Sequence, residues 1–123
     1  MSRRLRRVFD LTPKTVSEAE ELRERSESVG GTPIQECDKG ENVCACGVVR
    51  SVTIRPRAGT PALEAELYDG SGRITLVWLG RRMIEGITPG RWLKVQGRLN
   101  LCNDEKTIFN PYYELKPVGD SAQ

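Results

Sequence analysis

Histidine is absent from this chain of 123 residues, and the sequence contains neither a glycine-rich phosphate-binding loop nor a nucleophile beside a visible base. General acid–base and nucleophilic catalysis depend on such groups. The carboxylates Glu64 and Glu66 share one face of an expected strand, but so small a domain offers no deep cleft for glycoside hydrolysis. The sequence therefore favours a binding protein over an enzyme, and no cofactor is expected.

Long apolar runs are also absent. No run approaches the ~20 residues that a membrane-spanning helix needs. The basic start MSRRLRR is followed by VFDLTPKT, whereas a signal peptide would continue with an apolar stretch. We therefore expect a cytoplasmic protein with no membrane partner, built as one small domain with tails.

The four cysteines lack the C-x₂-C spacing of common zinc sites, because Cys44 and Cys46 are separated by a single residue. Two strand residues at that spacing cannot close an unstrained disulfide either. We expect Cys37, Cys44, Cys46 and Cys102 to be buried, unpaired thiols that act as small apolar residues, with no metal bound. A zinc-stabilised subunit of a larger machine remains the least favoured alternative.

Aromatic residues are scarce, with two Trp, three Tyr and two Phe. Charge, in contrast, is plentiful and unevenly distributed. Residues 1–14 carry a net charge of +4, residues 15–42 carry −5, and residues 43–123 carry +3. Any nucleic acid would therefore be held more by phosphate contacts than by base stacking, with modest, sequence-tolerant and salt-sensitive affinity.

The clearest local pattern is a β-hairpin in LYDGSGRITLVWLG. Gly70-Ser71 suits a two-residue loop of type II′. Counting outward from this turn places one set of apolar side chains on a single face, in the pairs Leu67 with Ile74, Ala65 with Leu76, and Leu63 with Trp78. The other face pairs Tyr68 with Arg73, Glu66 with Thr75, and Glu64 with Val77. A slip of one residue would reverse both faces, so the register is well specified.

The other elements are weaker in pattern. TPKTVSEAEELRERSES predicts a helix over residues 16–28, because Thr15 and Ser17 are each followed three residues later by a glutamate. Its narrow apolar stripe favours a solvated arm over a packed helix. Residues 43–57 predict a long strand bent at Gly47. Residues 91–102 alternate, with Leu93, Val95, Leu99 and Leu101 inward, and residues 107–115 form a last strand.

These elements give five strands, with a segment after the third strand (residues 80–90) that has room for one or two helical turns. The expected fold is all-β: a five-stranded Greek-key OB-fold barrel with an N-terminal helical arm and a short helical link after strand three. An SH3-like barrel is the competing topology. Residues 1–42 would form a basic tail, an acidic helix and a leading loop, residues 43–117 the barrel, and residues 118–123 a C-terminal tail.

Residues 43–115 resemble the OB-fold nucleic-acid-binding domains typified by the wedge domain of the branched-DNA helicase RecG and by anticodon-binding modules. The matching stretches are VCACGVV, YDGSGRITLVWLG, PGRWLKVQGRL and NPYYEL. With TPIQEC before the barrel and RPRAGTPALEAELYDGSG within it, the chain is also similar to small stand-alone OB-fold proteins of high-GC Gram-positive bacteria.

The resemblance implies that nucleic acid crosses strands two and three and is held by two loops, which here would be residues 55–61 and 103–106. The sequence departs from that pattern by placing Glu64 and Glu66 on the binding face and Asp104 and Glu105 in the second loop. The candidate nucleic-acid-binding residues are Arg55, Arg57, Tyr68, Arg73, Arg81, Arg82, Lys94 and Arg98.

The leading hypothesis is thus a bacterial OB-fold protein that binds single-stranded or branched DNA, or RNA. Each candidate cation taken alone is also what an ordinary solvated strand face would carry. The alternative is a protein-interaction module that docks through its acidic helix and its Glu64/Glu66 face.

Overall fold

The computed structural model describes residues 11–28 and 30–116. Most of the expected basic tail (residues 1–10) and the expected C-terminal tail (residues 118–123) lie outside the described residues. These residues form one α-helix, α1 (Leu11–Ser28), one short 3₁₀-helix, η2 (Ile34–Glu36), and seven strands. The strands are β1 (Asn42–Arg57), β2 (Thr60–Tyr68), β3 (Arg73–Leu79), β4 (Trp92–Arg98), β5 (Asn100–Cys102), β6 (Glu105–Phe109) and β7 (Tyr112–Lys116).

The strands form one mixed sheet in the order β5-β6-β3-β2-β1-β4-β7. The expectation of a five-stranded barrel is therefore wrong, because this sheet has seven strands and two open edges, β5 and β7, within the described residues. The predicted fourth strand is divided into β4 and β5, and the predicted fifth into β6 and β7.

Two local features cause these divisions. At Leu99 the backbone bonds to the leading loop instead of to a strand, since its N–H donates to Glu41 and its carbonyl oxygen accepts from Gly40. Pro111 has no N–H to offer a ladder, and the preceding Asn110 has a left-handed φ of 53°. Neither break is visible in the alternation of apolar and polar residues.

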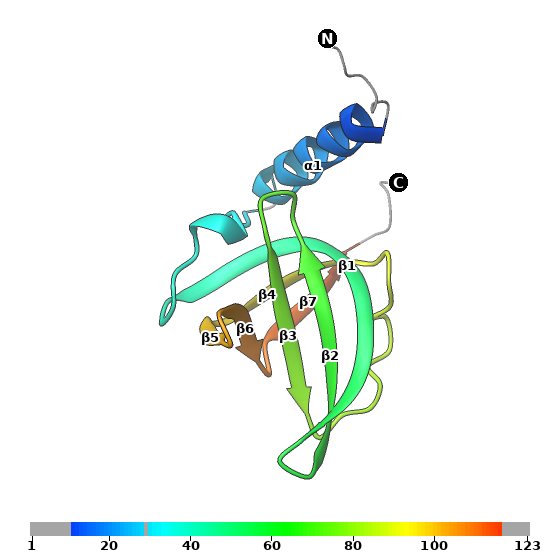
Figure 1. Cartoon of the computed structure of the whole chain (residues 1–123), viewed down its shortest axis with the longest axis vertical. Helices are drawn as coiled ribbons and strands as arrows, with labels where there is room; N and C mark the ends of the chain where they lie inside the picture. The colour runs from blue at the N-terminus through cyan, green and yellow to red at the C-terminus, as the bar shows by residue number, and fades with distance from the viewer. Residues whose placement is uncertain (1–10, 29, 117–123) are drawn as a thin grey trace.

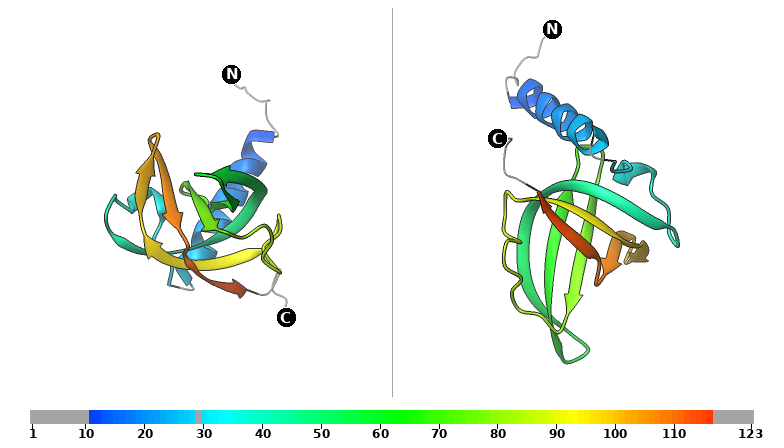
Figure 2. Two further views of the ribbon diagram at one scale, coloured as in Figure 1. Left: turned by 90° about the horizontal axis from the view of Figure 1, so that it is seen from below. Right: turned by 180° about the vertical axis from the view of Figure 1, so that it is seen from behind.

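The sheet nevertheless curls strongly. β6 and β7 are joined by only two residues, yet β6 pairs with β3 and β7 pairs with β4 near opposite ends of the strand order. The ends of the sheet must therefore approach each other, as the rounded shape in Figures 1 and 2 shows. The hydrogen-bonded ladder stays open while the strands still enclose one core.

The predicted β2–β3 register is confirmed in every pair, from Leu63 opposite Trp78 to Tyr68 opposite Arg73. The turn is closed partly by a side chain. Asp69 Oδ1 accepts hydrogen bonds from the N–H groups of Ser71 and Gly72 (2.9 and 3.0 Å), while Oδ2 accepts one from Ile34 N–H (2.9 Å). Asp69 is fully buried and ties the hairpin tip to η2.

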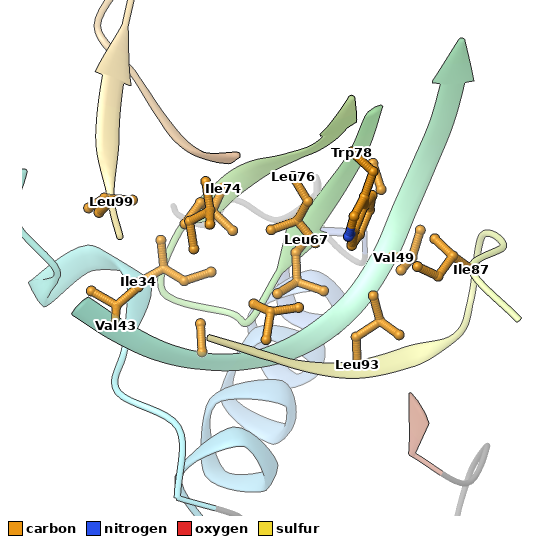
Figure 3. Packing of buried hydrophobic residues seen from close by; sticks show 14 of the residues in the cluster. Ile34, Val43, Val49, Leu67, Ile74, Leu76, Trp78, Ile87, Leu93 and Leu99 are labelled. Atoms are coloured by element: carbon orange, nitrogen blue, oxygen red, sulfur yellow. The ribbon is translucent and has the colours of Figure 1, made fainter. Parts of the chain in front are cut away.

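The core lies inside the curled sheet. Figure 3 shows side chains from β1, β2, β3 and β4 meeting there with Ile34, Ile87 and Leu99. The inward positions Leu93, Val95 and Leu99 are buried as predicted, but Leu101 is 46% exposed because β5 is a short edge strand.

β1 is a single long strand, as expected, and it pairs first with β4 and then with β2. Its register shifts between Val49 and Ser51, beyond the glycine where a bend was predicted. Gly47 serves close approach instead, because a Cβ there would collide with the carbonyl group of Tyr68. A glycine inside a strand often marks such an approach of another backbone.

The short helical link predicted after β3 is wrong. Residues 80–91, all of which the structure describes, form successive turns. Ile84 and Ile87 from this segment are buried in the core. The burial of these two side chains anchors the segment to the core without a helix.

Helix α1 begins at Leu11, five residues earlier than predicted, so Pro13 lies in its first turn, where helical N–H groups have no partner. From Ala19 onward α1 packs on the sheet, contrary to the expected solvated arm. The backbone of Ala19 touches Gly70 at the hairpin tip, Ser26 is buried, and the Arg25 guanidinium lies 4.5 Å from the centre of the Trp92 ring. Figure 1 shows α1 crossing the tip of the β2–β3 hairpin.

None of the described helices is long and apolar enough to span a membrane.

Candidate nucleic-acid interface

A polar groove of about 350 Å³ lies between the outer face of β1, β2 and β3 and the β5–β6 hairpin. It is lined by hydroxyl, amide, guanidinium and carboxylate groups, and it has few apolar walls. The lining residues are Ser51, Thr53, Arg55, Arg57, Glu64, Ala65, Glu66, Thr75, Cys102, Asn103, Glu105 and Thr107. We call this surface the groove.

Strand register places these side chains together. Ser51 lies opposite Glu66, Glu66 opposite Thr75, and Thr75 opposite Thr107, so one row of outward residues runs across four strands. Paired residues in a sheet point to the same side. The row therefore forms the floor of the groove, with Thr107 buried at its end.

One end of the groove carries Arg55 and Arg57, which point the same way from β1. The Arg57 guanidinium contacts Glu64 Oε2 through both Nε and a terminal nitrogen, each at 2.8 Å, while Arg55 Nε is 4.0 Å from Glu64 Oε1. The Arg55 side chain is 68% exposed and that of Glu64 only 13%. Glu64 thus orients Arg57, while Arg55 presents its charge to solvent.

The two loops expected to hold nucleic acid are shorter than predicted. The β1–β2 turn consists of Ala58 and Gly59, so Arg55 and Arg57 lie in strand β1. The β5–β6 turn consists of Asn103 and Asp104, so Glu105 and Lys106 belong to β6. All four turn residues have φ between 51° and 78°, the left-handed backbone that tight two-residue hairpins require. Rigid strand ends therefore present these side chains.

A second hollow of about 300 Å³ continues the groove toward the hairpin tip. It shares Thr75 and Glu105 with the groove and adds Gln35, Ser71, Arg73 and Lys106. Lys106 Nζ donates to the carbonyl oxygen of Ile34 at 2.6 Å, and Gln35 N–H donates to Ser71 Oγ at 3.1 Å. These two bonds hold η2, the tip of the β2–β3 hairpin and β6 together around the hollow.

Tyr68 and Arg73 stand opposite each other near the hairpin tip, as predicted. The Tyr68 ring is half-buried, and the guanidinium of Arg50 lies 4.0 Å from its centre. Arg73 is well exposed and lies 4.0 Å from Glu66. The available stacking surface of Tyr68 is therefore already shared with a cation of the protein itself.

The remaining predicted cations lie away from the groove lining. Arg81 and Arg82 are exposed in the turns after β3, which begin beside the β1–β2 turn, because Gly80 N–H donates to Pro61 at 2.7 Å. Lys94 and Arg98 project from the outer face of β4, where Lys94 lies opposite Cys46 and Glu114. The eight candidate residues thus occupy at least two surfaces.

All four cysteines are unpaired. Burial raises the pKa of the Cys46 thiol to about 11 and raises the pKa of Cys37 as well. Cys44 and Cys102 are half-buried, with Cys102 in the groove lining. Among the described residues, no three side chains of metal-binding type come together.

Sequence reasoning missed the hydroxyl groups of the groove and the role of Arg50. Ser51, Thr53, Thr75 and Thr107 carry no charge, so a search for cations and aromatic rings passes over them. Their signal was available in part, because Thr75 lies on the wet face of the predicted hairpin. Thr107 joins that row only through the parallel pairing of β6 with β3, which no local pattern reveals.

Comparison with known proteins agrees with this geometry. The chain matches the family described as OB-fold nucleic acid binding domain over residues 43–115, and it belongs to that family. The matched region contains every strand of the sheet except the first residue of β1 and the last residue of β7. The expected fold family is therefore confirmed, with the strand divisions described above.

Two solved structures match this chain. One is RecG bound to a three-way DNA junction, with 23% sequence identity and a TM-score of 0.55, covering 63% of this chain and 11% of that one. The other is a replication protein A heterotrimer bound to ssDNA, with 21% identity and a TM-score of 0.47, covering 71% of this chain and 64% of that one. The comparison with curated proteins found no match. This chain thus spans about a tenth of the RecG chain.

Proposed function

We propose that this protein binds single-stranded nucleic acid, with single-stranded or forked DNA as its ligand, in the groove and its continuation toward the hairpin tip. The observation that carries the proposal is the continuity of the two hollows, which share Thr75 and Glu105. Together they form a polar path lined by hydrogen-bonding groups from β1, β2, β3, β5 and β6. In this proposal a flexible single strand follows the path, and a stiff duplex binds it more weakly.

Phosphate contact in this proposal falls to Arg55, Arg57 and Arg73. A guanidinium has five N–H donors, so Arg57 can contact a phosphate while Glu64 holds two of its nitrogens. Four carboxylates line the same path and oppose phosphate, those of Glu64, Glu66, Asp104 and Glu105. We therefore expect modest affinity that falls steeply with salt and varies little with sequence.

Base contact in this proposal is mainly hydrogen bonding and not stacking. The groove lining has no aromatic side chain, but it offers the hydroxyl groups of Ser51, Thr53 and Thr75 and the amide of Asn103. Hydroxyl groups both donate and accept, so they accommodate any base. The protein acts in this proposal as a binding module and performs no chemistry on its ligand.

The first experiment is a fluorescence anisotropy titration with a single strand, a duplex and a fork of DNA, and with matched RNA, at two salt concentrations. We expect the single strand and the fork to bind at low salt, and the duplex to bind more weakly. Comparing the affinities for RNA and DNA shows whether the 2′-hydroxyl group affects binding. If no single strand binds at low salt, the proposal is wrong and the protein-interaction alternative takes its place.

The second experiment localises the binding site. The double variant Arg55→Gln/Arg57→Gln should weaken single-strand binding and reduce the log–log salt slope by ~0.7 for each phosphate that the protein no longer neutralises. The double variant Arg23→Gln/Lys39→Gln is the matched control, since it removes two exposed cations outside the groove. An equal loss of affinity in both double variants would mean that only total charge matters, which would contradict a groove site.

A third variant tests whether Tyr68 adds one stacking contact at the end of the path, since it lies opposite Arg73 but lines neither hollow. Tyr68→Ala should weaken single-strand binding while leaving the salt slope nearly unchanged, because a stacked ring releases no counterions. A reduced slope would instead show that Tyr68 acts only by holding Arg50 in place.

A further inference from the structure

The outer face of β4 and β7 forms a second surface that the groove does not include. Strand register aligns Gln96 with Cys44 on one side and Tyr112 on the other, and Lys94 with Cys46 and Glu114. Arg98 extends the same outward row of β4. We call the surface made by Lys94, Gln96, Arg98, Tyr112 and Glu114 the β4–β7 face.

Tyr112 is the most exposed large apolar side chain of the described residues, at 83% exposure. It stands between two shallow hollows, and it lines both. One hollow, of about 370 Å³, also includes Lys94 and Glu114, and the other, of about 330 Å³, also includes Asn42 and Cys44. Gln96 is common to both hollows and adds an amide beside the ring. A flat ring between two hollows presents a face on which a base can stack.

The charge of the β4–β7 face suits phosphate better than that of the groove. Lys94 and Arg98 supply two cations, and the carboxylate of Glu114 lies 3.3 Å from Lys116 Nζ, so its charge is partly balanced. The groove lining, in contrast, sets three carboxylates against two arginines. An aromatic platform flanked by cations is the arrangement that single-strand binders use.

The two surfaces share no lining residue. β1 runs through both, with Cys44 in its first half on the β4–β7 face and Arg55 in its second half on the groove. One strand laid in the groove therefore leaves the β4–β7 face unoccupied. A forked ligand has a second strand available at the same time.

From this juxtaposition we infer that the β4–β7 face is a second nucleic-acid site, where Tyr112 stacks on a base of the second strand of a fork and Lys94 and Arg98 contact its phosphates. The inference rests on the proposed function, because it assigns the first strand to the groove. It also gives a role to Lys94 and Arg98, which the fold separates from Arg55 and Arg57.

The test compares two DNA ligands, a single strand of about eight nucleotides, within the ~4 to 16 that one OB fold covers, and a fork with two such arms. Tyr112→Ala should weaken fork binding by about 5- to 150-fold, the range expected when one base loses its stacking partner. It should leave the short single strand unaffected. Tyr112→Phe keeps the ring and should bind the fork normally.

Matched variants keep the test specific. Met83→Ala removes another highly exposed side chain (77%), from the turns after β3, and should change neither ligand's affinity. Lys94→Gln/Arg98→Gln should reduce the salt slope for the fork by ~0.7 to 0.9 per phosphate and leave that of the short strand unchanged.

The outcomes are distinguishable from failure of the proposed function. If the short strand binds and depends on Arg55 and Arg57, but Tyr112→Ala leaves fork affinity unchanged, only the second site is overturned. If Tyr112→Ala weakens the short strand as much as the fork, the face belongs to the first strand's path and the inference is again wrong. If neither ligand binds the unmutated protein, the proposed function itself fails.

Discussion

Glu66 shows how single carboxylates set the strength of the groove. Its side chain is one-third exposed and lies in the middle of the row that runs from Ser51 to Thr107. Its nearest cation, Arg73, is 4.0 Å away, so the carboxylate charge is only partly compensated. A phosphate chain crossing this row would therefore be repelled at Glu66.

Glu66→Gln should accordingly strengthen single-strand binding. Two unit charges ~4 Å apart in water interact by about 1 kcal/mol, so we expect a gain of up to about fivefold at low salt. Glu85→Gln is the matched control, because Glu85 is exposed in the turns after β3 and does not line the groove. Equal gains in the two variants would indicate a general charge effect and would contradict the assigned path.

Cys46 gives the protein a predictable dependence on alkaline pH. Burial raises the pKa of its thiol from 9.0 to about 11, so the folded state holds the proton more tightly than the unfolded chain does. The stabilisation is complete below pH 9 and is lost as the pH rises to 11. Denaturant unfolding at several pH values should show this decline, and Cys46→Ala should lessen it. An identical decline in both proteins would mean that other groups cause it.

Among the elements, the β2–β3 hairpin was predictable from sequence because turn chemistry and alternation act over neighbouring residues. Gly70 and the pairs from Leu63 to Trp78 fix one register. The loops around the groove were not predictable to the same degree. Arg55 and Arg57 extend β1 because Ala58 accepts a left-handed φ of 51°, which lets a two-residue turn replace the expected long loop.

A substitution at Gly47 tests the close approach of β1 to the end of β2. An added Cβ would collide with the carbonyl group of Tyr68, so Gly47→Ala must push two strands apart. We expect a loss of ~1 to 3 kcal/mol in the free energy of unfolding, as for overpacked sites. Gly72→Ala is the control, since its Cβ would come no closer than 3.4 Å to a side-chain atom. Equal stabilities of the two variants in denaturant titrations would contradict the close approach.

Variants of the two tryptophans should distinguish packing in the core from packing of α1 on the sheet. Trp78 lies in the main core and its Nε1 donates to the carbonyl oxygen of Pro111 at 3.1 Å, whereas Trp92 is buried on the outer face beneath Arg25. Trp78→Ala should cost ~3 to 5 kcal/mol of unfolding free energy. Trp92→Ala should cost less and should mainly accelerate amide exchange in α1. Equal losses, with α1 still protected, would show that Trp92 belongs to the core.

At the scale of the whole molecule, the curl of the sheet decides which residues can act together. Composition and periodicity identified the cations correctly as outward-facing, for example Lys94 and Arg73. They could not predict that Lys94 and Arg55 lie on different surfaces, because this depends on how β1 curves around the core from β4 to β2. Long-range pairing, such as β3 with β6, likewise has no local signal.

The same curl explains how one small sheet offers two different surfaces. The groove lies where the outer face of β1, β2 and β3 meets the β5–β6 hairpin, and the β4–β7 face lies beyond it around the sheet. Helix α1 packs on the hairpin tip and over Trp92. The fold thus leaves both polar surfaces open while it buries a single core.

Nucleic-acid binding in the groove is tested most directly by an NMR titration of the protein with a short oligothymidylate at low salt, in which every backbone amide is followed. We expect the largest shift changes on residues 51–57, 64–66, 73–75 and 102–107, the segments that line the groove and its continuation. Shift changes confined to α1 and the turns of residues 80–91, or no change at all, would contradict a nucleic-acid path through the groove.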